Sequence, residues 1–111
     1  MSANKTNWKP EGFVREKLTK EDMDRLIDEL TALIPNHFKA YGAGIFMHPH
    51  EIVGCMTGQQ IKLSQAADAS IYDGDLTAFR VRCMKTLMAM IVGLASVDKL
   101  IELRGAVGGK E

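Results

Sequence analysis

An uncharged run of twelve residues, 86–97 (TLMAMIVGLASV), lies near the end of this chain of 111 residues. A helix of that length spans roughly 18 Å, too short for the ~30 Å hydrocarbon core of a bilayer. Its residues are apolar around most of the helix circumference, which is typical of a helix packed on several sides. The run therefore predicts a packed helix in an all-α protein and no association with a membrane.

The helix that contains this run is predicted at 75–103, because Asp73 and Asp75 flank Gly74 and either can cap its start. Two adjoining apolar stripes run along this predicted helix. They are Phe79, Cys83, Leu87, Met90, Leu94, Val97 and Ile101, and then Val81, Met84, Met88, Ile91 and Ala95. A chain of this size has little other apolar surface with which to cover both stripes.

Uncovered apolar surface usually marks an interface, so we expect a homodimer in which two copies of this helix meet. The alternative is that the helix forms the centre of a monomeric bundle. The residues expected at the self-association surface are Leu87, Met88, Ile91 and Leu94.

A first long helix is predicted at about 19–41. Thr19 offers an N-cap, and acidic residues follow it where the helix dipole favours negative charge. The apolar positions recur at helical spacing. They are Met23, Leu26, Ile27, Leu30, Leu33 and Ile34. Pro35 should end or kink this helix, with a kinked continuation to Tyr41 before Gly42.

Between the two long helices the pattern predicts short helices or loops. Pro49 suits the first turn of a short helix that Gly58 would stop, and residues 59–70 are rich in helix formers. A minor hairpin within 44–63 is the alternative. The resulting organisation is a mobile N-terminal arm at 1–18, a single helical domain at 19–104 and a frayed tail at 105–111.

Fourteen basic and fourteen acidic residues give a formal net charge of zero, so no global field favours nucleic acid or anionic lipid. Residues 1–20 nevertheless carry five basic and two acidic side chains. Trp8 lies among these cations, and an aromatic ring beside cations can stack on a base. Together with Arg80 and Arg82, the basic arm makes a nucleic-acid-binding regulator the first alternative function.

The two cysteines, Cys55 and Cys83, do not form a disulfide framework or a CxxC pair. The first residues also lack the apolar core of a secretory signal. Both features lead us to expect a reducing, cytoplasmic location.

Metal-ligating residue types gather at His48, His50 and Cys55. Two histidines separated by a proline do not make a recognised closed site, and the simpler interpretation is a loop that caps the next helix. A small metal-dependent enzyme centred on His48 and His50 is the second alternative. We expect no cofactor, because no phosphate-binding glycine motif occurs.

No nucleophile has a base and an orienting group beside it in the sequence, so no catalytic residue is assigned. The favoured hypothesis is a non-enzymatic adaptor, regulator or inhibitor that self-associates and binds another protein. The residues expected to contact that partner are Trp8, Phe13, Arg80 and Arg82.

Overall fold

The computed structural model describes residues 14–106, and all regular structure within them is helical. Three helices follow one another: α2 (Lys20–Tyr41), α3 (Pro49–Asp73) and α4 (Leu76–Ala106). The predicted all-α class is thus confirmed. Most of the arm predicted at 1–18 and of the tail predicted at 105–111 lies outside the described residues. The tail prediction was wrong for Gly105 and Ala106, because α4 continues through both.

Helix α2 begins as its sequence predicts. The Thr19 hydroxyl accepts a hydrogen bond from the backbone N–H of Asp22 at 3.1 Å, and the Asp22 carboxylate accepts one from the N–H of Thr19 at 3.0 Å. This reciprocal capping box satisfies two donors that a helix start leaves free. The helix continues through Pro35 and ends at Gly42, whose φ of 84° suits glycine.

Helix α3 corrects the prediction for the middle of the chain. A single helix of 25 residues replaces the expected short helices or loops, it passes through Gly58, and the described residues contain no strand at 44–63. A glycine inside a helix costs only about 1 kcal/mol relative to alanine. Packing along α4 and the helix formers after Gly58 outweigh that cost.

The ends of α3 have clear physical causes. His48 is the N-cap, and its Nδ1 accepts a hydrogen bond from the backbone N–H of His50 at 3.0 Å. At the other end Gly74 adopts the left-handed conformation with φ 71°. Asp75 then caps α4, because its Oδ1 accepts from the N–H of Ala78 at 3.1 Å.

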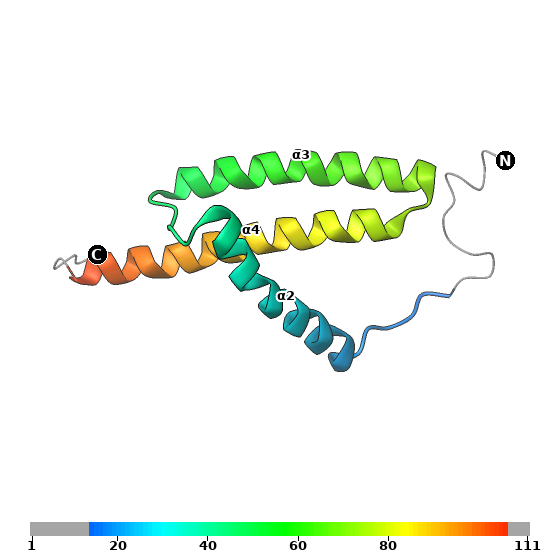
Figure 1. Cartoon of the computed structure of the whole chain (residues 1–111), viewed down its shortest axis with the longest axis horizontal. Helices are drawn as coiled ribbons and strands as arrows, with labels where there is room; N and C mark the ends of the chain where they lie inside the picture. Colours follow the sequence, from blue (N-terminus) through cyan, green and yellow to red (C-terminus); the bar gives the residue numbers. More distant parts are fainter. Residues whose placement is uncertain (1–13, 107–111) are drawn as a thin grey trace.

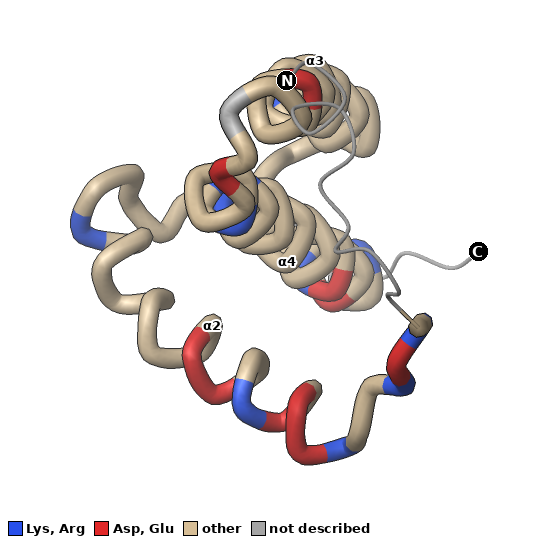
Figure 2. Tube along the Cα trace, turned by 90° about the vertical axis from the view of Figure 1, so that its right-hand side faces the viewer, with Lys and Arg blue, Asp and Glu red and all other residues tan. Residues whose placement is uncertain are grey.

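Helix α4 is the central element. It runs antiparallel to α3, while α2 crosses it obliquely (Figure 1). The view along the hairpin shows α3 and α2 on different sides of α4 (Figure 2). At 31 residues α4 is roughly 46 Å long, so neither neighbour covers its whole circumference.

The apolar core lies where α2 crosses α4. Leu30 is buried there against Met84 and Met88. Partly buried residues surround these three, namely Leu26, Ile34 and Ile91. Because α2 crosses α4 rather than following it, Met23 and Ile27 of its apolar stripe stay about half exposed, at 48% and 56%.

The contact between α3 and α4 combines a buried isoleucine with small and polar side chains. Gly93 allows close approach, because a Cβ atom added there would lie 2.9 Å from Cγ2 of Ile52. Two turns further along α3, the Gln59 side-chain oxygen accepts a hydrogen bond from Arg82 at 2.5 Å. The connection before α3 is held by Ser96, whose Oγ accepts from the N–H of Phe46 at 3.0 Å.

Candidate protein-binding face

One side of α4 presents a row of large apolar side chains to solvent. Leu87 is 39% exposed, Met90 42%, Leu94 58% and Ile101 62%. Their spacing of three, four and seven residues places them on one side of a helix. Within residues 14–106, neither α2 nor α3 packs over this row, so it forms an exposed apolar stripe.

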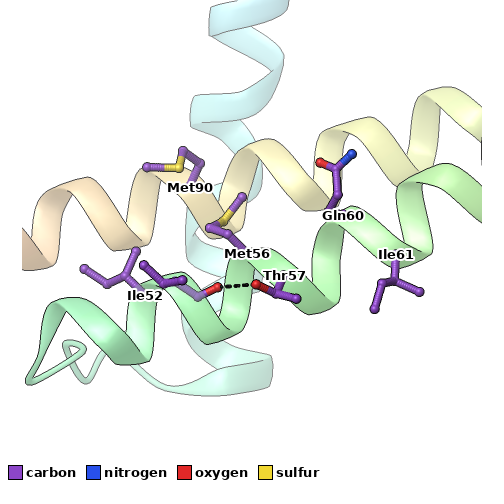
Figure 3. A pocket seen from close by; sticks show the side chains of 7 residues that line it. Ile52, Met56, Thr57, Gln60, Ile61 and Met90 are labelled. Carbon is purple, nitrogen blue, oxygen red and sulfur yellow. Dashed lines mark hydrogen bonds between the residues drawn. The ribbon is translucent and has the colours of Figure 1, made fainter.

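A shallow, open groove extends the stripe onto α3. It has a volume of about 460 Å³ and is lined by one residue of α4, Met90, and six of α3. The six are Ile52, Val53, Met56, Thr57, Gln60 and Ile61. In Figure 3, Met56 points from α3 toward α4, where Met90 lies, and Ile61 stands further along α3. We call the α4 stripe and this groove together the hairpin face.

The hairpin face is almost free of charge. Residues 86–97 of α4 carry no charged side chain, and between Glu51 and Asp68 α3 carries only Lys62. Polar atoms in the groove are few, and the Thr57 hydroxyl already donates to the carbonyl of Val53 at 2.9 Å. Such a surface can bind apolar side chains.

The structure divides the four residues predicted for self-association. Leu87 and Leu94 lie on the exposed stripe. Met88 is instead 6% exposed in the core with Leu30, and Ile91 packs against that core. The correction has a geometric cause, since Met88 and Ile91 belong to the second apolar stripe of α4, which α2 covers.

Arg80 and Arg82, predicted for partner binding, both have partners within the chain. The Arg80 guanidinium donates to both carboxylate oxygens of Glu29, at 2.9 and 2.7 Å. These hydrogen bonds lower the pKa of Glu29 and raise that of Arg80. Arg82 donates to Gln59 between the helices. Trp8 and Phe13 lie outside the described residues.

The three weak metal candidates do not come together. The rings of His48 and His50 stack with centroids 5.0 Å apart, and His48 caps α3. Cys55 is a partly buried free thiol on α3. Within residues 14–106, no group of three or more His, Cys, Asp or Glu side chains is placed to hold a metal ion.

Sequence reasoning missed the contribution of α3 to the hairpin face. Val53, Thr57 and Ile61 repeat every four residues, which indicates one side of a continuous helix. That signal is readable only if the helix passes through Gly58. Ending the helix there divided the pattern and hid the groove.

Comparison with protein-family models, with curated proteins and with solved structures finds no match for this chain. Within residues 14–106, no helix has both the length and the apolar character needed to cross a bilayer.

Proposed function

We propose that this protein is a non-enzymatic interaction protein, an adaptor, regulator or inhibitor that self-associates through α4 and acts by binding other proteins. The observation that carries the proposal is the exposed row of Leu87, Met90 and Leu94 inside an uncharged segment. Large contiguous apolar patches are rare on soluble monomers and usually mark an interaction surface.

The rest of the molecule is consistent with a binding role. Arg80 and Arg82 donate hydrogen bonds to Glu29 and Gln59 of the same chain, so they do not form a free basic patch. Cys55 and Cys83 are free thiols, as expected for the cytoplasmic location that we propose.

Self-association is tested by light scattering during size-exclusion chromatography, at several concentrations of the full chain. The expected mass is that of two chains, and Leu94→Glu should shift the mass toward one chain, because a carboxylate in an apolar interface is strongly unfavourable. Leu103→Glu is the matched control, since Leu103 is 50% exposed but lies two residues beyond Ile101, on another side of α4. A wild-type chain that stays single at high micromolar concentration would contradict the proposal.

A further inference from the structure

The exposed stripe of α4, together with the partly buried Cys83 and Val97, has the spacing of a coiled-coil seam. Its members succeed one another at intervals of four, three, four, three and four residues. They are Cys83, Leu87, Met90, Leu94, Val97 and Ile101. This alternation keeps apolar residues facing a neighbouring helix over three heptads.

No helix of the described chain occupies that seam. The side of α4 bearing Gly93 packs on Ile52 of α3, and the side bearing Met84 and Met88 packs on α2. The seam is the third side, where Leu94 and Ile101 are 58% and 62% exposed. A seam with this spacing is therefore suited to binding a further helix.

We propose that the occupant is α4 of a second copy, antiparallel to the first, with a two-fold axis passing near Val92. The seam is symmetric about that residue. Met90 and Leu94 are each two positions away, Leu87 and Val97 five, and Cys83 and Ile101 nine. An antiparallel pair centred there brings each seam residue opposite its counterpart, so every layer is apolar, as an isologous interface requires.

Charge favours the antiparallel direction. Residues 80–85 carry three basic side chains and no acidic one, whereas 98–104 carry two acidic and two basic. Glu29 neutralises Arg80, but Arg82 and Lys85 still leave this end of α4 positive. An antiparallel pair places the positive end of each α4 beside the end of the other whose charges balance, whereas a parallel pair would place the two positive ends together.

The groove supplies the complementary shape. In this register Leu94 of one copy lies opposite Met90 of the other, where the groove between α4 and α3 opens. Leu94 of each copy therefore enters the groove of the other copy. The two-fold axis makes this contact occur twice. Seam and groove join into one apolar surface, and contiguous apolar patches of a few hundred Å² are often functional. A polar rim would complete the ~800 Å² per partner of a standard interface.

This inference rests on the proposed self-association, and a disulfide test separates the two. In the antiparallel pair Cys83 lies opposite position 101 of the second copy, so Ile101→Cys should form a covalent dimer under oxidised glutathione. Within one helix, positions 83 and 101 are roughly 27 Å apart, too far for an intrachain bond. Cys55→Ser is included throughout to remove the other thiol.

Two matched variants decide the direction. Leu103→Cys places a thiol on another side of α4 and should give several-fold less covalent dimer. Cys83→Ser combined with Ile101→Cys should likewise lose the dimer band, because only the 83–101 pair is in reach. If light scattering shows a dimer but the Ile101→Cys band survives Cys83→Ser or never forms, the antiparallel arrangement is overturned while self-association stands. A wild-type monomer would overturn both.

Discussion

The guanidinium of Arg80 and the carboxylate of Glu29 form a two-point ion pair between α4 and α2, with N–O distances of 2.9 and 2.7 Å. Glu29 adjoins Leu30, the buried residue of α2, so the pair lies beside the small apolar core. Paired hydrogen bonds fix orientation as well as distance. Together they hold α2 at its crossing point on α4.

The attachment of α2 is expected to weaken in acid. Hydrogen bonds from Arg80 lower the pKa of Glu29 below its usual 4.5. The stabilising contribution is therefore complete above pH 4.5 and is lost as the pH falls through the lowered value. Glu29→Gln should lower the urea midpoint at pH 7, and its difference from wild type should shrink toward pH 3. A difference that is the same at both pH values would show that the pair does not stabilise the fold.

The close contact of Gly93 with Ile52 predicts that larger residues will open the helical hairpin. Even a Cβ atom at position 93 would lie 2.9 Å from Cγ2 of Ile52, which is buried. Gly93→Val should therefore destabilise the protein by roughly 1–3 kcal/mol, the usual cost of overpacking. Urea unfolding measures the change.

Gly54 and Gly58 provide matched controls for that variant. Both lie inside α3, and no atom stands within 4 Å of a Cβ atom added at either. Gly58→Ala should stabilise the protein by about 0.5–1 kcal/mol, because alanine has the higher helix propensity. If Gly58→Ala is destabilising instead, its side of α3 is occupied by a group absent from the described chain.

Removing the Ser96 hydroxyl is expected to loosen the connection between α2 and α3. Its hydroxyl accepts from the backbone N–H of Phe46 at 3.0 Å and donates to the carbonyl of Val92 at 2.8 Å, and the residue is 1% exposed. Ser96→Ala leaves that N–H without its partner, at a cost of about 1–3 kcal/mol. Amide hydrogen exchange at Phe46 should accelerate.

The control for Ser96 is Thr57→Ala. The Thr57 hydroxyl also donates to a carbonyl four residues earlier, that of Val53, but it is exposed. Its removal should change the stability by no more than about 0.5 kcal/mol. Equal losses in the two alanine variants would mean that the bond to Phe46 carries no specific energy.

Local signals in the sequence predicted much of this fold. The capping box at Thr19 and the cap at Asp75 depend on neighbouring residues alone, and both starts were predicted correctly. Helix α3 was missed because the cost of Gly58 is local, whereas the packing that offsets it is tertiary. The same limit applies to Met88. Periodicity identified two apolar stripes on α4, but not which of them α2 would cover.

The Gln59–Arg82 contact is expected to set the register of the hairpin. One Gln59 oxygen accepts from Arg82 at 2.5 Å and from the Thr86 hydroxyl at 3.4 Å, and Arg82 Nε is the only buried side-chain nitrogen or oxygen of the described residues without a partner. Gln59→Leu would leave the guanidinium unpaired between the helices and should cost about 1.5–3 kcal/mol.

Replacing both members should reverse that loss. In the double variant Gln59→Leu with Arg82→Leu no charge remains to be desolvated, so its stability should equal or exceed that of wild type. Urea unfolding of the four proteins in this double-mutant cycle gives the coupling energy. Additive losses would show that the two side chains act independently. A stable double variant whose α3 amide resonances are broadened would show that α3 and α4 then pack in more than one register. The Gln59–Arg82 pair would in that case select a single register.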